Sequence, residues 1–120
     1  MKRKCFNEMA CPIARSLEKV GEWWSILILR DAALGKTRFD EFQKSLGIGS
    51  NTLTRRLNWL VAQGLLERRG CGDRPSRHEY VLTASGREFQ PVLQAFLAWG
   101  RKHAPAREEA PRDSTAAPAR

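Results

Sequence analysis

Residues 37–63 read TRFDEFQKSLGIGSNTLTRRLNWLVAQ, and this stretch decides the fold. Two helical patterns of apolar residues meet in it, the first over 39–46 and the second over 50–63. Only Gly47-Ile48-Gly49 separates the two patterns. Two short helices joined by a tight glycine-containing turn are typical of a helix-turn-helix motif. The stretch therefore predicts that motif, with its second helix as the reading helix.

The helix expected over 50–63 has two chemically different faces. At about 100° per residue its apolar residues fall on one side and are expected to pack inward. These residues are Leu53, Leu57, Leu60 and Val61. Asn51 and Arg55 lie near the opposite pole, so the outward face is polar and basic. The first helix of the motif is expected to be capped by Thr37, with Asp40 as the acid of a capping box.

The flanking residues predict further helices and a hairpin. In chain order these are a helix opened by Pro12 and ended by Gly21, a helix over about 22–34, two strands over 65–69 and 79–82, and a final helix over 83–100. The helix over 22–34 is apolar all round, which predicts a central core helix. Pro91 is expected to bend the final helix or to split off its first turn. This order predicts a mainly α fold with a small β-hairpin, the winged helix-turn-helix.

Composition indicates the class of partner. The chain has 120 residues, which suits one compact domain, and 42% of them are hydrophobic. Lys and Arg number 21 against 13 Asp and Glu, a formal net charge of +8. Six cations stand against two acids over residues 55–77 alone. A chain that can build a core and still carries this positive excess is typical of nucleic-acid binding.

The sequence does not indicate a membrane protein, a metal-binding protein or an enzyme. No apolar stretch approaches the roughly 20 residues that span a bilayer, and no signal core follows the N-terminus, so a cytoplasmic location is expected. Cys5, Cys11 and Cys71 form no CxxC pair and stand apart from the two histidines, so we expect no metal and no cofactor. Catalytic motifs such as GxSxG and HExxH are absent from the sequence, so we expect no enzyme.

We divide the chain into three parts. Residues 1–10 form an N-terminal arm, residues 11–103 the winged helix-turn-helix DNA-binding domain, and residues 104–120 a tail. The tail is rich in alanine and proline and has no aliphatic side chain larger than alanine. Such a segment cannot bury enough surface to fold, so we expect it to be disordered.

Several segments resemble the HxlR-type family of bacterial transcriptional regulators, which are relatives of the MarR-like regulators. The motifs follow one another in family order over about residues 9–103: Cys11-Pro12, GEWWSILILR at 21–30, RFDEF at 38–42, LGI at 46–48, NTLTRRL at 51–57, GLL at 64–66, EYVLT at 79–83, Gly86, PVL at 91–93 and Trp99-Gly100. Two places depart from the family. Glu22 and Trp23 replace a usual Gly and Lys, and Ser76 interrupts a usual Pro-Pro before Arg77.

The resemblance implies a homodimer, joined through the N-terminal segment and the C-terminal helix, that binds a roughly palindromic operator in double-stranded DNA. The sequence adds a second reason to expect a dimer. Apolar residues of the last helix spread over more than one face, which is more than a terminal helix needs within its own domain: Phe89, Val92, Leu93, Phe96, Leu97 and Trp99. We therefore expect a sequence-specific transcriptional regulator, and a repressor rather than an activator.

The candidate DNA contacts fall in two groups. Side chains on the first turns of the reading helix can meet base edges in the major groove. These are Ser50, Asn51, Thr52 and Arg55. Arg56 lies toward the packed side and is expected to reach a phosphate or an internal acid. On the hairpin, Arg74 and Arg77 can follow the DNA backbone or enter the minor groove. A merely solvated basic face is the alternative for both groups.

Cys11 is the candidate residue for regulation. It stands just before a helix N-terminus, where unpaired amides and the helix dipole lower the pKa of a thiol. The resemblance implies that a cysteine at this place can sense oxidants or electrophiles, and Cys5 or Cys71 could then complete a disulfide. The alternative is an ordinary small buried residue. A small-molecule effector is the other means of control, and Trp23 could line either its pocket or the dimer interface.

Two other functions stay open at this stage. One is a thiol-dependent redox protein that uses Cys11 and Cys71 as a catalytic pair, and the other is a DNA-binding protein without an effector. The place of Trp59 is open as well, because this side chain could lie beneath the hairpin or against a dimer partner.

Overall fold

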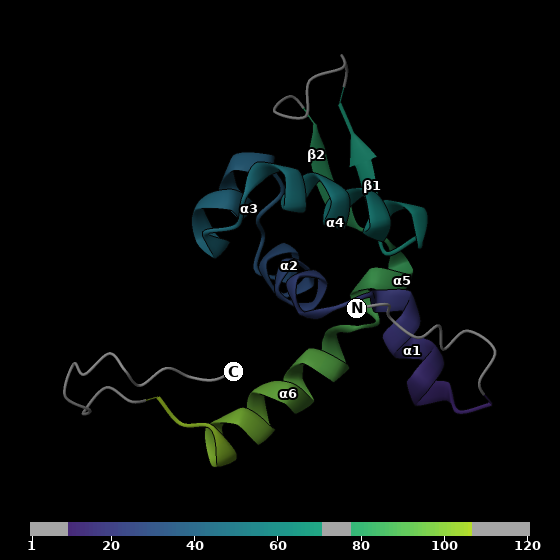
Figure 1. The fold of residues 1–120 in the computed structure, drawn as a ribbon, viewed down its shortest axis with the longest axis vertical. Helices are drawn as coiled ribbons and strands as arrows, with labels where there is room; N and C mark the ends of the chain where they lie inside the picture. Colours follow the sequence, from purple (N-terminus) through teal and green to yellow (C-terminus); the bar gives the residue numbers. More distant parts are fainter. Residues whose placement is uncertain (1–9, 71–77, 107–120) are drawn as a thin grey trace.

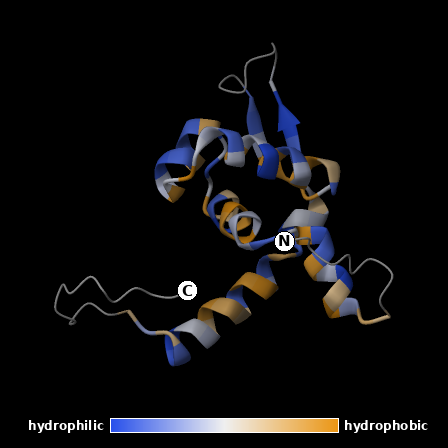
Figure 2. Cartoon of the chain, in the orientation of Figure 1, coloured by the Kyte–Doolittle hydropathy of each residue, from blue (hydrophilic) through white to orange (hydrophobic). Residues whose placement is uncertain are grey.

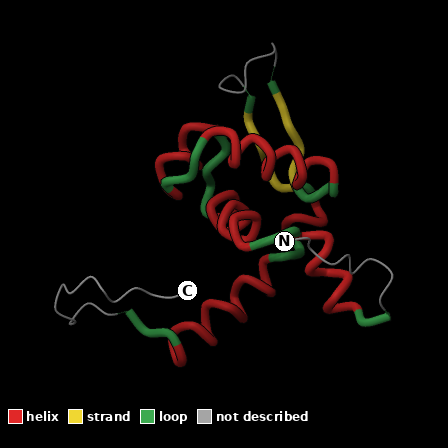
Figure 3. Tube along the Cα trace, in the orientation of Figure 1, coloured by secondary structure: helices red, strands yellow, loops and turns green. Residues whose placement is uncertain are grey.

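The computed structural model describes residues 10–70 and 78–106, which hold eight helices and strands. These are α1 (Pro12–Val20), α2 (Trp23–Ala33), α3 (Phe39–Leu46), α4 (Ser50–Ala62), β1 (Leu66–Arg69), β2 (Glu79–Leu82), α5 (Ala84–Arg87) and α6 (Gln90–His103). Figure 1 shows α2 in the middle, α3, α4 and the strand pair at one end of the molecule, and α1 and α6 toward the other. The expected class is confirmed, a mainly helical chain with a small antiparallel hairpin (Figure 3).

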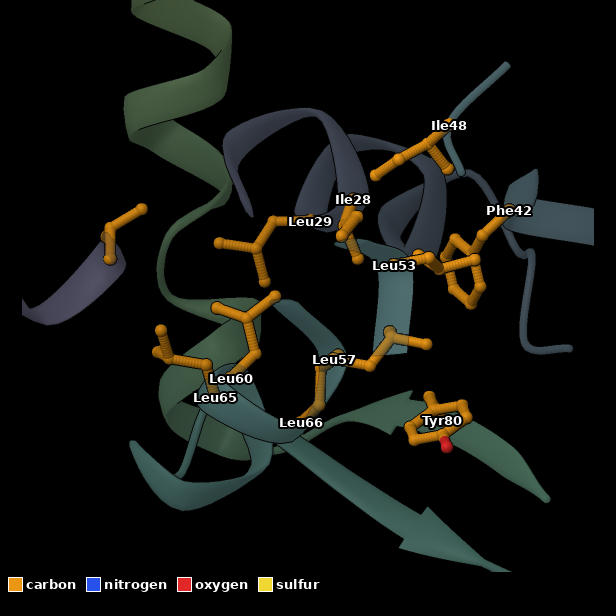
Figure 4. Packing of buried hydrophobic residues seen from close by; sticks show 11 residues of the cluster. Ile28, Leu29, Phe42, Ile48, Leu53, Leu57, Leu60, Leu65, Leu66 and Tyr80 are labelled. Carbon is orange, nitrogen blue, oxygen red and sulfur yellow. The ribbon is translucent and has the colours of Figure 1, made fainter. Parts of the chain in front are cut away.

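The core lies between α2 and α4. The fully buried side chains of α4 are three of those predicted from its apolar face, Leu53, Leu57 and Leu60. Figure 4 shows them facing Ile28 and Leu29 of α2, which are buried to the same degree. Val61, the fourth predicted residue, is only partly buried. Because each buried leucine stabilises the fold by about 1.5–3 kcal/mol, this row of side chains fixes which face of α4 turns outward.

The capping box predicted from Thr37 and Asp40 is wrong by one residue. The N-cap of α3 is Arg38, and the acid is Glu41. The Glu41 carboxylate accepts the backbone N–H groups of Thr37 and Arg38 at 2.9 and 3.0 Å. These two bonds hold the pKa of the Glu41 carboxyl below its ordinary value. A glutamate at the third helical position has the reach to satisfy the N-cap amide, which is why the box forms around Glu41.

One side of the central helix α2 stays uncovered. The expected central position is confirmed, since Ile28 and Leu29 are among the most buried residues of the chain. Trp23 at the start of the helix, however, is 70% exposed, and Leu34 just after its end is 72% exposed. The apolar residues of this helix therefore lie on two surfaces. One side packs in the core, and the other is an exposed apolar face.

The two strands pair antiparallel, with Leu66 opposite Leu82. β1 begins one residue later than predicted, because Leu65 is a buried residue of the preceding turn and its carbonyl accepts the backbone N–H of Thr83. The tip of the hairpin, residues 71–77, lies outside the described residues.

The final helix is split near Pro91, which is one of the two expected alternatives. The first piece, α5, is a single turn whose N-cap hydroxyl, on Thr83, accepts the N–H of Gly86 at 3.0 Å. Gly86 has no room for a side chain, since a Cβ there would collide with the backbone carbonyl of Leu65. The second piece, α6, starts afresh with Pro91 in its first turn and ends at His103.

Helix α6 projects from the rest of the molecule. None of its 14 residues is buried, although Figure 2 shows hydrophobic residues along most of its length. Phe96 and Trp99 are the most exposed of its large apolar side chains, at 56 and 63%. Among the described residues, no helix has the length and apolar character needed to cross a membrane.

Candidate nucleic-acid interface

The outward face of α4 carries the predicted base-contacting residues. Ser50, Asn51 and Arg55 are exposed, and Thr52 is partly buried beside them. The three buried leucines of α4 leave Asn51 and Arg55 on the opposite side of the helix, with Thr52 at the flank, and Ser50 is exposed because it begins the helix. The structure thus brings the four residues together on the first two turns of the reading helix, the part that enters the major groove in this motif.

The start of α4 is tied to α3 through Gln43. The side-chain amide of Gln43 donates to the Ser50 hydroxyl at 3.1 Å and to the carbonyl of Ile48 at 3.4 Å. Gly47 permits the turn between the helices, since its φ is 65°. Ser50 is therefore exposed and also bonded to a side chain of α3. The two bonds of Gln43 link α3 to the turn and to the start of α4.

Arg56 differs from the other predicted DNA residues. Its guanidinium forms an ion pair with Glu22, Nε to Oε2 at 2.9 Å, and both side chains are about 30% exposed or less, at 26 and 31%. Of the two partners expected for Arg56, the structure provides the internal acid. Glu22 also accepts the backbone N–H of Trp24 at 2.7 Å as the N-cap of α2. One carboxylate thus caps the central helix and holds a cation of the reading helix.

Trp59 lies against the end of α1 rather than beneath the hairpin. Its indole Nε1–H donates to the backbone carbonyl of Lys19 at the end of α1, over 2.9 Å. The indole also lies against Gly21, where a Cβ would come within 3.2 Å of Nε1. No local sequence pattern signals this contact, because its partner is a main-chain carbonyl 40 residues away.

Cations of the hairpin lie next to α4. Arg68 donates to the side-chain oxygen of Asn58 on α4 at 3.1 Å. Arg69 pairs with Glu67 on the same strand at 3.3 Å. The predicted contacts Arg74 and Arg77, like Cys71, fall outside the described residues. The described base of the hairpin therefore presents basic side chains beside the outward face of the reading helix.

Cys11 is exposed at the N-cap of α1. The nearby backbone N–H groups of Ala14 and then Ile13 lower the pKa of its thiol, and the charge of Arg15 lowers it further. The buried-residue alternative does not hold within the single protomer, because Cys11 is exposed there. No three His, Cys, Asp or Glu side chains gather to hold a metal within the described residues.

Two apolar hollows flank α6. One, of about 690 Å³, lies between α2 and α6 and includes Trp23, Leu34 and Leu97 in its lining. The other, of about 510 Å³, lies between α1 and α6 and includes Ile13 and Leu17. Of the helices that line them, α1 and α6 lie toward the end of the molecule away from α4 (Figure 1). The sequence predicted excess apolar surface on the last helix and a place for Trp23 in a pocket or interface, but not the exposed Ile13 and Leu17 of α1.

Known proteins are similar to this chain in sequence and in fold. The HxlR-like helix-turn-helix family matches residues 19–108. An uncharacterised HTH-type transcriptional regulator of Mycobacterium tuberculosis is 41% identical over 99 residues, which are 82% of this chain and 63% of the relative. The chain therefore spans less than two thirds of that relative's length.

Two solved structures are similar to this chain in both sequence and fold. The crystal structure of PA1607, described as a candidate transcription factor, is 41% identical with a TM-score of 0.76, over 95% of this chain and 82% of that one. The redox regulator HypR in its reduced form is 30% identical with a TM-score of 0.69, over 77% and 92%. With the family matching well over half of its length, the chain belongs to the HxlR-like helix-turn-helix family of transcriptional regulators.

Proposed function

We propose that the chain acts as a homodimeric, sequence-specific repressor whose affinity for its DNA operator changes when the Cys11 thiol is modified. The observation that carries the proposal is the division of the molecule into two ends. Hydrophilic residues predominate on α4 and the two strands at one end (Figure 2), and exposed apolar side chains lie on α1, on α6 and at the ends of the central helix α2.

The basic end suits double-stranded DNA. Asn51 and Arg55 are exposed on the first turns of α4, and these side chains can pair bidentately with adenine and guanine in the major groove. Arg68 and Arg69 at the base of the hairpin add charge that phosphates attract. Arg74 and Arg77 would extend that charge along the hairpin, as the sequence predicts.

The apolar end suits a second copy of the chain. Ile13 and Leu17 of α1 are 71 and 52% exposed, and α6 buries none of its residues within its own protomer. Exposed apolar side chains on this scale are typical of an interaction surface. Two reading helices related by a two-fold axis would then meet two half-sites, which matches a roughly palindromic operator.

The means of control that the geometry favours is thiol chemistry. Cys11 is exposed, its pKa is lowered by backbone amides, and it lies on the helix that would contribute Ile13 and Leu17 to the dimer. The similarity to HypR, which is named a redox regulator and is also solved in its oxidised form, supports this choice. The rival thiol enzyme needs Cys71, which lies outside the described residues.

A direct test uses the reduced protein and a duplex that the wild-type chain selects from a random-sequence pool. A mild oxidant or a quinone should modify Cys11 before the other two cysteines, by mass spectrometry, and change the affinity for the selected duplex. Cys11→Ser should bind the duplex and lose the response, whereas Cys5→Ser and Cys71→Ser should keep the first modification step. Release of DNA from oxidised Cys11→Ser, or labelling of Cys71 before Cys11, would overturn the thiol-control part of the proposal.

A further inference from the structure

The junction between α1 and α2 is clasped to the reading helix by two side chains of α4. Only Gly21 and Glu22 separate the two helices. On one side of this link the Lys19 carbonyl accepts the indole N–H of Trp59 at 2.9 Å. On the other side the Glu22 carboxylate pairs with Arg56 at 2.9 Å. We call these four contacting residues, Lys19, Glu22, Arg56 and Trp59, the clasp.

The clasp matters because α1 buries little of its own surface. Val20, at the very end of α1, is its only buried residue. Ile13 and Leu17 point to open apolar surface. The direction in which α1 leaves the molecule is therefore set at its C-terminal end, by Val20 and by the bond from Trp59 to Lys19. Loss of the Trp59 bond would remove one of these two constraints on the direction of α1.

The backbone at Gly21 favours a sharp turn between α1 and α2. Gly21 has a φ of 109° and a ψ of −79°, a conformation that side chains rarely adopt. A Cβ at this position would also press against the Trp59 indole at 3.2 Å and the Ser25 hydroxyl at 3.4 Å. The chain thus turns from α1 into α2 on a residue without a side chain, and the Trp59 indole lies against the space left there.

We propose that Trp59 and Glu22 are positioning residues for operator recognition, which couple the direction of α1 to the placement of α4. Neither residue needs to touch DNA for this role. In a dimer joined through α1 and α6, a rigid link between α1 and α4 fixes the distance between the two reading helices, and hence the spacing of half-sites that the dimer accepts. This inference rests on the proposed function, because it assumes a dimer that reads two half-sites.

The experiment compares half-site spacings. From the duplex selected by the wild-type chain, variants are made with one base pair inserted or removed between the half-sites, and their affinities are measured beside the original. Trp59→Phe removes the indole donor and keeps an aromatic ring, and Glu22→Gln removes the charge that pairs with Arg56 and keeps an oxygen for the Trp24 amide. In each, the preference for the original spacing should fall by about fivefold, roughly the effect of one hydrogen bond on an equilibrium.

Matched variants separate positioning from charge and stability. Glu67→Gln removes the same charge from an exposed strand position, and Trp24→Phe removes an indole that packs on the core. These variants should alter affinity for all spacings alike and leave the preference unchanged. Circular dichroism confirms that each variant is folded, and Glu22→Gln carries the test if Trp59→Phe is not.

The two possible failures are distinguishable. If Trp59→Phe and Glu22→Gln keep the wild-type spacing preference while binding DNA, the clasp has no positioning role and the proposed function stands. If the wild-type chain selects no paired half-sites, the dimeric reading of an operator is wrong, and the clasp proposal is overturned with it.

Discussion

Arg68 on β1 donates a hydrogen bond to the side-chain oxygen of Asn58 on α4, over 3.1 Å. Asn58 lies three residues after Arg55, so the two share a face of the reading helix. The hairpin therefore rises directly beside the predicted base contacts. This relationship gives the basic end of the molecule one continuous surface, and the first two predictions concern that surface.

Arg55→Ala should weaken binding to the selected duplex by about 1–3 kcal/mol and relax selectivity at one base position, because a bidentate contact to guanine would be lost. Titrations against the selected duplex, its single-base variants and a random duplex measure this. Compared with Arg55→Ala, Arg55→Lys keeps the positive charge but lacks the planar guanidinium that can donate two hydrogen bonds to one base. It should therefore restore little of the selectivity. Equal losses on selected and random DNA would assign Arg55 to a phosphate.

Neutralising Arg74 and Arg77 together should weaken binding to all DNA and flatten its dependence on salt concentration by up to about two phosphates per protomer. The measurement is the slope of log affinity against log salt. Arg101→Gln with Lys102→Gln removes the same charge from the exposed end of α6 and should leave the slope nearly unchanged. A wild-type slope in the hairpin variant would remove the hairpin from the interface.

Leu97→Glu should convert a dimer to monomer, because Leu97 lines the hollow between α2 and α6 and a buried unpaired charge is strongly destabilising. Sedimentation at micromolar concentration measures the oligomeric state. Ala98→Glu places the same charge about 100° around α6 from Leu97, between the polar residues Gln94 and Lys102, and should leave the dimer intact. A wild-type monomer under these conditions would contradict the dimer itself.

Ala14→Pro should shift the pH profile of Cys11 alkylation to higher pH. The backbone N–H of Ala14 is the main cause of the lowered thiol pKa, and proline lacks that group. The thiolate is the nucleophile, so a higher pKa means that the rate rises later as pH increases. Ala14→Gly keeps the N–H and should retain the wild-type profile. Identical profiles for the two variants would show that the amide has no such effect.

Gly86→Ala should destabilise the fold by about 1–3 kcal/mol, because the new methyl would meet the Leu65 carbonyl and force the backbone to move. Gly100→Ala is the matched change, since nothing lies within 4 Å of a Cβ there. In a helix that substitution should stabilise by about 0.5–1 kcal/mol. Denaturant titration gives both free energies of unfolding, and a neutral Gly86→Ala would contradict the close approach.

Much of the fold could be predicted from the sequence because its signals are local. The leucine spacing of α4 predicts both the buried and the outward face, and Pro91 predicts the break between α5 and α6. The cap of α3 was misplaced by one residue because Asp40 and Glu41 stand side by side and both can serve in a capping box. Such choices depend on side-chain reach rather than on periodicity.

The contacts of Arg56 and Trp59 could not be predicted in the same way. Each joins α4 to a segment more than 30 residues earlier, and the acceptor for Trp59 is a main-chain carbonyl that every residue possesses. The departure of Glu22 from the family pattern was the visible signal, since it places a carboxylate where glycine is usual. Only the three-dimensional arrangement shows which cation it meets.

The abundance of the protein has a consequence for the stability of helix α6. An isolated helix of 14 residues is only marginally stable in water, and none of the residues of α6 is fully buried within its own protomer. If a second copy supplies that burial, the stability of the helix becomes a function of protein concentration through mass action. The rate of synthesis would then set the fraction of chains with an ordered C-terminal helix, so that gene dosage becomes an input to regulation alongside any chemical signal.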